Sequence, residues 1–349
     1  MLSFKEFQEY VMDHIREYLP EEYANAEVSV RTVQKLNGVT LQGLEIWTPE
    51  MKQGTGVTPT IYLNGIYENY ENGVDLEVIM EHIGNLERQS MDLPEDVAEI
   101  KEMYKDVNYV KDRLIVSLIS AERNVDFLKD KPYRMLEDLA IFYKVLISKD
   151  ANGTGTITVT NNHMEYWGLT EEQLYETAIK NSNVLEPPSI DRLTNVMADT
   201  HDGKNYWGAG MDEDIIENQL KEDDIDMYVI SNTTKANGAS VIVYSDALQQ
   251  VAENLGSDLY ILPSSIHEVL ALPVGNKDVD SLEEMVRCVN QTEVSPTEVL
   301  SDNVYKYDAE SRTLSLASAK AETVKETAVC EPSGYTGTVN EVARPRHHR

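Results

Sequence analysis

The chain has 349 residues, of which 41% are hydrophobic and 26% are charged, a composition typical of a globular protein and not of a disordered or fibrous one. Its 61 Asp and Glu residues outnumber its 30 Lys and Arg residues, which gives a formal net charge of −31. A protein that neutralises nucleic-acid phosphates needs clustered Lys and Arg, so the charge argues against direct nucleic-acid binding.

The first residues, Met1 to Phe7, contain no cationic stretch followed by an apolar run, as a secretory signal would. No window approaches the roughly 18 consecutive apolar residues that cross a bilayer. The two cysteines, Cys288 and Cys330, give neither a disulfide framework nor a metal pair. We therefore expect a cytoplasmic protein that does not associate with membranes.

The N-terminal region, residues 1–92, has the pattern of a helix, a β-hairpin and a further helix. Ser3 and Glu6 have the spacing of a capping box, and apolar residues then recur at helical period. β-rich alternation follows from Ala26 to Trp47. It is broken at Asn37-Gly38, a dipeptide that suits a two-residue hairpin turn.

The larger region, residues 93–316, mixes strands with helices. Buried strands are expected at Leu114–Ser120 and Leu139–Ser148, and Thr170-Glu-Glu-Gln173 is a second capping box that opens a helix. Further strands are expected to pair on either side of Asn237-Gly238.

A last long helix is expected to be capped by Ser281 and Glu284, and the periodic pattern ends near Leu316. Residues 317–349 are rich in Ala, Glu, Thr, Val and Lys, which predicts a disordered C-terminal tail. The sequence therefore predicts an α+β protein with mixed or antiparallel sheets and flanking helices.

The local signatures of several enzyme classes are absent. No G-x-G-x-x-G follows a strand, and the chain has no Walker phosphate loop, G-x-S-x-G elbow, H-E-x-x-H or C-x-x-C. We therefore expect no cofactor, and the sequence favours a non-catalytic protein over an enzyme.

One segment concentrates reactive side chains. Leu262-Pro-Ser-Ser-Ile-His-Glu268 places Ser264, Ser265, His267 and Glu268 directly after a predicted strand. A serine nucleophile needs a base within hydrogen-bond reach and an acid that orients the base, so these residues are candidates for a hydrolase. Ser-Ser after Pro also favours a local turn through hydroxyl-to-backbone bonds, and this structural interpretation is the preferred one.

A second segment resembles a calcium loop. Asp150, Asn152 and Thr154 stand at the first three ligand positions, but Asn161 stands where a bidentate Glu is expected. The segment lies between predicted strands. A Gly-rich β-turn is therefore favoured over a metal site.

Two further groups are candidate binding residues. Tyr62, Tyr67 and Tyr70 could form an aromatic recognition face, although half-buried packing is favoured for tyrosines. The stretch 211–226 is strongly acidic and is placed on the surface; its candidate residues are Asp212, Glu213, Asp214, Asp223 and Asp224.

Several segments carry a family resemblance, spread over about residues 1–316. They are Asn37-Gly-Val-Thr-Leu-Gln-Gly-Leu44, Thr58-Pro-Thr-Ile-Tyr-Leu-Asn64, Leu136-Glu-Asp-Leu-Ala-Ile141, Met227-Tyr-Val-Ile-Ser-Asn232 and Tyr260-Ile-Leu-Pro-Ser-Ser-Ile-His-Glu268. The chain resembles a family of uncharacterised proteins from anaerobic gram-positive gut bacteria. The resemblance implies relatives but no activity, cofactor or catalytic residue.

These observations favour a non-catalytic binding protein with an unknown protein partner. One alternative is an acidic nucleic-acid mimic that modulates a DNA-handling protein, because rows of carboxylates would attract a basic partner. A second alternative is a hydrolase that uses the Ser264/Ser265, His267 and Glu268 cluster.

Overall fold

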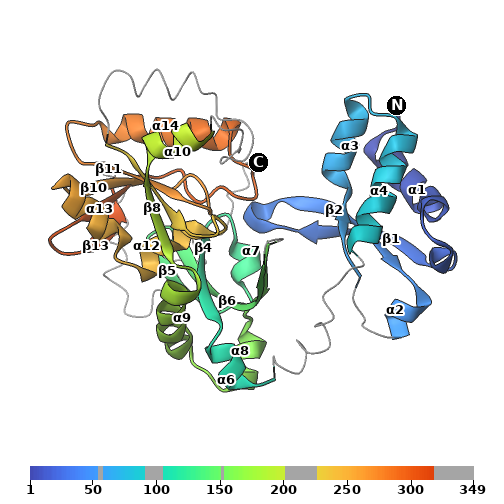
Figure 1. Ribbon diagram of the computed structural model, residues 1–349, viewed down its shortest axis with the longest axis horizontal. Helices are drawn as coiled ribbons and strands as arrows, with labels where there is room; N and C mark the ends of the chain where they lie inside the picture. The colour runs from blue at the N-terminus through green and yellow to red at the C-terminus, as the bar shows by residue number, and fades with distance from the viewer. Residues whose placement is uncertain (54–57, 91–104, 151–152, 201–225, 318–349) are drawn as a thin grey trace, which may run out of the picture. The chain divides into compact units, whose positions relative to one another are not determined.

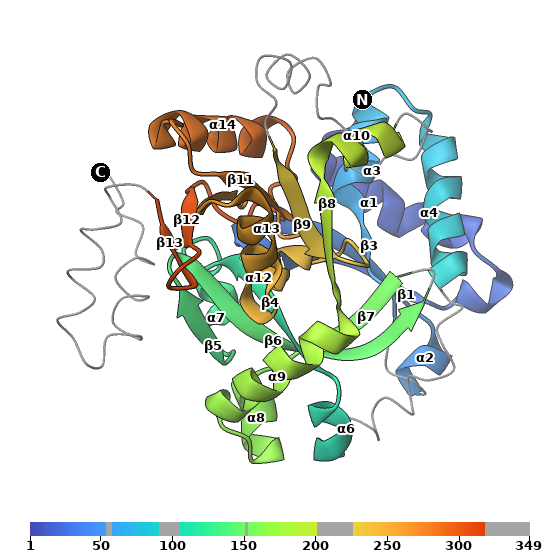
Figure 2. The same cartoon turned by 60° about the vertical axis from the view of Figure 1, so that its left-hand side comes forward.

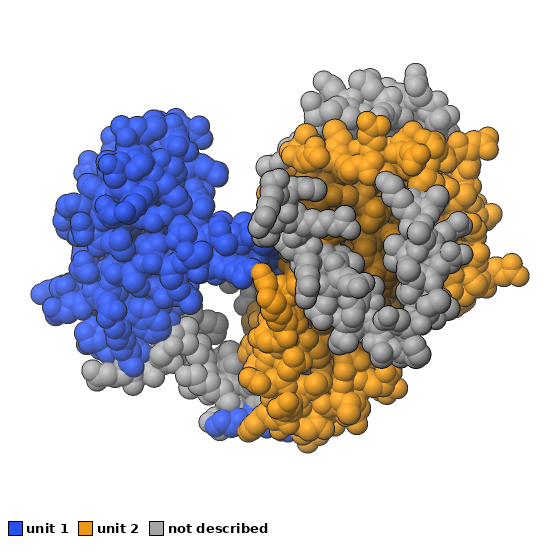
Figure 3. Space-filling model, turned by 180° about the vertical axis from the view of Figure 1, so that it is seen from behind, with its two compact units in different colours: residues 1–106 blue, residues 107–349 orange. Residues whose placement is uncertain are grey.

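The computed structural model describes residues 1–53, 58–90, 105–150, 153–200 and 226–317. The chain divides into two compact units, Met1–Asp106 and Val107–Arg349, which Figure 3 colours separately. The predicted boundary after residue 92 and almost all of the predicted tail lie outside the described residues.

The first unit combines a three-stranded sheet, in the order β1-β2-β3, with helices (Figure 1). Its elements are α1 (Phe4–His14), β1 (Glu27–Gln34), β2 (Thr40–Trp47), α2 (Pro49–Gln53), β3 (Ile61–Tyr62), α3 (Leu63–Glu71) and α4 (Leu76–Ser90). The Ser3 hydroxyl accepts a hydrogen bond from the Glu6 N–H, and the Glu6 carboxylate accepts one from the Ser3 N–H. The capping box predicted at the start of α1 is therefore confirmed.

The core of this unit lies between the sheet and its three longer helices. Leu44 and Ile46 are two residues apart on β2 and so point to the same face of the sheet. They are fully buried in one cluster with Phe7 and Val11 of α1 and with Ile83 of α4. Burial of such side chains stabilises each by about 1.5–3 kcal/mol relative to exposure.

The predicted hairpin of the first unit is confirmed, with a longer turn than expected. β1 and β2 pair from Glu27 opposite Trp47 to Gln34 opposite Thr40. The Lys35 N–H closes the loop on the Val39 carbonyl at 2.7 Å. Between Lys35 and Val39, residues Leu36–Gly38 form a short 3-10 turn, and both Asn37 and Gly38 have positive φ.

The second unit contains two sheets, and every strand pairing in the described residues is antiparallel. One sheet is built around β6, which has β4 on one edge and both β5 and β7 on the other. The other sheet has the order β13-β12-β10-β11-β9-β8. The strands are β4 (Leu114–Ser120), β5 (Tyr133–Leu136), β6 (Leu139–Asp150), β7 (Gly153–Thr158), β8 (Pro188–Arg192), β9 (Tyr228–Asn232), β10 (Leu259–Leu262), β11 (Val269–Pro273), β12 (Tyr305–Asp308) and β13 (Thr313–Leu316). The predicted α+β class is confirmed.

Helices cover both faces of the six-stranded sheet, with α10 and α14 on one face and α12 and α13 on the other (Figures 1 and 2). Leu262 and Leu272 pack against Leu282 and Val286 of α14, so the alternate residues of these strands face the other helices. The helices of the unit are α6 (Val107–Lys111), α7 (Val125–Leu128), α8 (Asn161–Trp167), α9 (Glu171–Leu185), α10 (Leu193–Thr200), α12 (Val241–Tyr244), α13 (Ala247–Leu255) and α14 (Val279–Thr292). Within the part of the chain that the structure describes, no helix combines the length and apolarity needed to cross a bilayer.

Two local predictions in the second unit were wrong. The chain after Asn237 forms a 3-10 turn, Gly238–Ser240, and then helix α12. It does not form a strand paired with β9, whose partners are β8 and β11. A short apolar run fits either a strand or a buried helix. Helix α14 is capped by Asp278, whose carboxylate accepts from the Ser281 N–H at 3.1 Å, so Ser281 lies inside the helix.

Candidate functional site

Reactive side chains of the second unit gather where its two sheets meet. After β10 the chain runs antiparallel to a later segment: the Ile266 N–H donates to the Glu298 carbonyl at 2.9 Å, and the Leu300 N–H donates to the Ser264 carbonyl at 3.0 Å. We call the polar side chains around these two segments the polar seam; its members are Asp138, Lys144, Glu186, Asn232, Ser265, His267, Glu268, Glu298, Ser301, Asp302 and Asn303.

Ser265 stabilises a turn. Its hydroxyl accepts a hydrogen bond from the backbone N–H of His267 at 3.0 Å, and the residue is 8% exposed. This is the hydroxyl-to-backbone bond by which serine stabilises local turns. Ser264 contributes its backbone carbonyl to the ladder with Leu300. Neither hydroxyl is hydrogen-bonded to the imidazole of His267 in the described structure.

The ring of His267 is held on both nitrogens. Nδ1 accepts a hydrogen bond from the Asn237 N–H at 3.2 Å, and Nε2 lies 3.5 Å from a carboxylate oxygen of Glu298. The neutral ring therefore carries its proton on Nε2, facing Glu298. The hydrogen bond to Glu298 raises the pKa of His267, and burial opposes this effect.

The carboxylate predicted to orient His267 has a different environment. Burial raises the pKa of Glu268, and the charge of His267 and the hydroxyl of Ser265 lower it in part. The ring is instead paired with Glu298, which is 31 positions away in the sequence. The structure thus brings Ser265, His267 and Glu268 close together without forming the nucleophile–base–acid order of the hydrolase hypothesis.

The loop that carries Asn237 is fixed by close backbone packing. The Ser231 hydroxyl donates to the carbonyl oxygen of His267 at 2.7 Å. A Cβ on Gly238 would lie 2.1 Å from the Ser231 hydroxyl and 2.5 Å from the same carbonyl oxygen. Only glycine fits this approach, which holds the Asn237 N–H against the imidazole.

Glu186 is the second anchor of this loop. It is 6% exposed, and its carboxylate accepts hydrogen bonds from Lys149 Nζ at 3.2 Å, Asn232 Nδ2 at 2.8 Å and Thr234 Oγ1 at 3.1 Å. A buried carboxylate needs such compensation for its lost hydration. Burial also lowers the pKa of nearby Lys144 to about 8, although the Glu186 charge opposes the shift.

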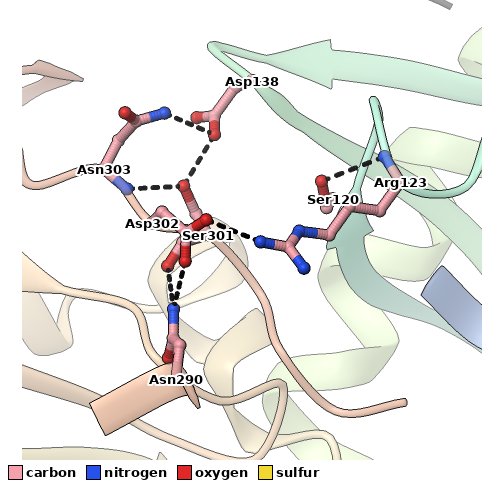
Figure 4. Close-up of polar contacts among 7 residues, drawn as sticks. All are labelled: Ser120, Arg123, Asp138, Asn290, Ser301, Asp302 and Asn303. Carbon is pink, nitrogen blue, oxygen red and sulfur yellow. Dashed lines mark hydrogen bonds and ion pairs between the residues drawn. The ribbon is translucent and has the colours of Figure 1, made fainter. Parts of the chain in front are cut away.

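Asp138 lies at the other end of the seam, in the turn between β5 and β6 (Figure 4). Its carboxylate accepts hydrogen bonds from Ser301 Oγ at 2.7 Å, Asn303 Nδ2 at 3.0 Å and the Tyr305 hydroxyl. These contacts join the turn of one sheet to the segment that leads into β12 of the other. The preceding residue, Glu137, has φ 54°, a backbone conformation uncommon outside glycine.

Asp302 extends the same network (Figure 4), and its side chain is 38% exposed. Its carboxylate accepts from Arg123 Nη2 at 2.6 Å and from Asn290 Nδ2 at 2.7 Å. Asn290 also donates to the Ser301 carbonyl at 3.0 Å. The network therefore links α14, the turn after β4 and the segment before β12, and its donors and acceptors largely satisfy one another.

Two of the three tyrosines considered as a candidate aromatic face are part of the packing of the first unit. The Tyr67 hydroxyl donates to the Leu2 carbonyl at 3.0 Å, and the Tyr70 hydroxyl accepts from the Leu2 N–H at 3.0 Å. Both rings pack on Phe7. Tyr62 lies apart from this contact, with Lys35 Nζ 4.0 Å from its ring centroid.

The segment resembling a calcium loop joins β6 to β7 as a hairpin. Asp150 pairs with Gly153, and Lys149 pairs with Thr154. Asn152 lies outside the described residues, as do the acidic candidates Asp212, Glu213, Asp214, Asp223 and Asp224. Within the described ranges, no three His, Cys, Asp or Glu side chains are grouped so as to hold a metal ion.

The sequence predicts Ser265, His267 and Glu268 as site residues but none of the other seam members, of which Glu298 and Glu186 are the clearest cases. Glu298 and Glu186 stand in segments without a local motif, and each acts on residues at least 31 positions away. Glu186 precedes Pro187-Pro188, which marks a helix end but not a buried carboxylate. No local signal in the sequence identifies either role.

The fold and the polar seam define a two-unit α+β protein whose clustered polar groups bond mainly to one another. The chain belongs to the family of unknown function DUF5688, whose model matches residues 4–309. This confirms the resemblance to a family with no assigned activity. No curated protein and no solved structure matches the chain.

Proposed function

We propose that the protein is a non-catalytic binding protein whose partner is a protein with a basic surface. The observation that carries the proposal is the net charge of −31 together with its location. Among the described residues, Glu87, Glu186 and Glu283 are the buried acids, so the other described carboxylates are at least partly exposed. Such a surface attracts a basic partner through long-range steering.

The arrangement of the seam supports binding over hydrolysis. A hydrolase of the predicted kind would need a serine hydroxyl at a free nitrogen of His267. In the described residues Asn237 and Glu298 engage the two nitrogens, and Ser265 bonds to backbone. The nucleic-acid mimic is a special form of the binding proposal, in which the basic partner is a DNA-handling protein.

Capture from the native lysate tests this proposal. We expect the immobilised full chain to retain a basic protein at about 50 mM salt and to release it at about 300 mM, because screening shortens the reach of surface charges. An unrelated protein of similar net charge serves as the control for non-specific retention. Competition by duplex DNA would support the mimic form. Capture of no macromolecule, or of partners that salt does not release, would contradict the proposal.

A further inference from the structure

A small cavity of ≈ 240 Å³ lies in the first unit, lined by Asn25, Glu27, Trp47, Pro49 and Lys52. Glu27 and Trp47 are register partners at the open end of the β1–β2 hairpin. Pro49 and Lys52 come from α2, which lies beside that end of the sheet (Figures 1 and 2). The cavity is smaller than the roughly 300–1,000 Å³ of small-molecule pockets, so its size suits a single side chain.

The lining of this cavity combines an aromatic ring with a carboxylate. The Trp47 indole N–H donates to Glu45 at 3.5 Å, which helps to fix the ring. The Glu27 side chain is 67% exposed. An indole next to a carboxylate is a favourable environment for a cation, through cation–π attraction and a charge-assisted hydrogen bond.

The chain already places a cation of its own in this environment. Lys52 Nζ is paired with a carboxylate oxygen of Glu27, and the Lys52 side chain is 46% exposed. An ion pair between two such exposed side chains is weak and readily exchanged. Lys52 therefore shows which kind of group fits, and a ligand with a better match to the ring and the carboxylate can replace it.

We propose that this cavity binds an arginine side chain of the basic partner, which pairs with Glu27, stacks on Trp47 and displaces Lys52. The inference rests on the proposed function. Arginine fits better than lysine because its planar guanidinium stacks on an aromatic face while its donors pair with a carboxylate. Lys52 is thus an internal competitor for the partner.

Titration of the full chain with a tetra-arginine peptide tests the inference, with affinity measured by calorimetry and the Trp47 indole N–H followed by NMR. We expect Glu27→Gln to weaken binding about tenfold or more, because it removes a charge-assisted hydrogen bond. We expect Lys52→Met to tighten binding about two- to fivefold, because it removes the competitor. In the wild type, the Trp47 signal should shift on addition of the peptide.

Glu50→Gln is the matched control, since it removes one exposed carboxylate on α2 that does not line the cavity. Equal effects of Glu27→Gln and Glu50→Gln, weaker binding by Lys52→Met, or an unmoved Trp47 signal would each overturn the inference. So would a complete lack of peptide binding. The capture experiment tests the proposed function independently of this cavity. If the cavity does not bind arginine, the protein can still retain a basic partner through its other carboxylates.

Discussion

Glu87 is a residue whose charge conflicts with its surroundings. It is fully buried in the first unit, and neither carboxylate oxygen has a hydrogen-bond partner among the described residues. Burial raises its pKa to about 7 from 4.5, and the nearby Tyr23 hydroxyl offsets only part of the shift. The side chain is therefore partly protonated near neutral pH, since an isolated buried carboxylate is strongly disfavoured.

Replacement of Glu87 by Gln should stabilise the protein at high pH. The pKa of Glu87 is higher in the folded state than in the unfolded state. Ionisation of the carboxyl therefore leaves the free energy of unfolding unchanged below pH 4.5 and lowers it by the full amount above about pH 7. A shift of this size corresponds to about 3 kcal/mol. We expect the free energy of unfolding of E87Q to exceed that of the wild type by up to this amount at about pH 8, and by far less at about pH 5.

Urea titration at both pH values measures this difference. Glu81→Gln, an exposed site on the same helix, is the control and should change stability by less than about 0.5 kcal/mol. A gain for E87Q that is the same at both pH values would show that ionisation of Glu87 is not its cause.

At the scale of elements, helix α8 begins with a capping box that contains a histidine. The His163 N–H donates to Thr160 Oγ1 at 3.3 Å, and His163 Nδ1 accepts from the Thr160 N–H at 3.2 Å. The ring also stacks on Trp167. Burial lowers the pKa of His163, although the Thr158 backbone and Asp130 oppose this. A protonated ring has no lone pair for the Thr160 N–H.

The start of α8 should therefore loosen in acid. The folded pKa lies below the unfolded value of 6.5, so the stability that the neutral ring provides is complete above 6.5 and is lost as the pH falls through the folded pKa. We expect hydrogen exchange of α8 amides, corrected for its intrinsic pH dependence, to show less protection below 6.5 than above it. His163→Gln keeps a capping side chain that does not titrate and should abolish the difference; persistence of the difference in that variant would refute the role of His163.

The elements that could be predicted from the sequence are those set by neighbours in the chain. The capping box of Thr170 and Gln173 and the strands of the β1–β2 hairpin depend on residues a few positions apart, and all are confirmed. Helix α12 was mistaken for a strand because its short apolar run fits either element, and the turn before it makes a contact that the sequence does not show, the Ala239 N–H with the Ile266 carbonyl at 3.1 Å. The pairing of His267 with Glu298 is likewise set by the two antiparallel segments after β10, and no sequence motif at either residue predicts that these segments pair.

At the scale of the whole molecule, Asp138 joins the two sheets of the second unit through the seam. Removing its side chain leaves the fully buried Tyr305 hydroxyl without this acceptor and also frees Ser301 and Asn303. An unsatisfied buried polar group costs about 1–3 kcal/mol.

We therefore expect Asp138→Ala to lower the free energy of unfolding by about 2–4 kcal/mol in urea denaturation. Asp126→Ala, which removes an exposed carboxylate paired with Lys129, is the control for loss of one negative charge in the same unit. Equal stability of the two variants would mean that the seam contributes nothing to the union of the sheets.

The two sheets differ in how soon their strands become available during synthesis. β5, β6 and β7 form consecutive hairpins between Tyr133 and Thr158, whereas the six-stranded sheet needs chain from Pro188 to Leu316. Closing a long loop costs more entropy than closing a short one, and local contacts form sooner. On the ribosome, strands β5 to β7 would be complete before the partners of Asp138 had been translated, so a pause in translation before Ser301 would leave the junction open to chaperones.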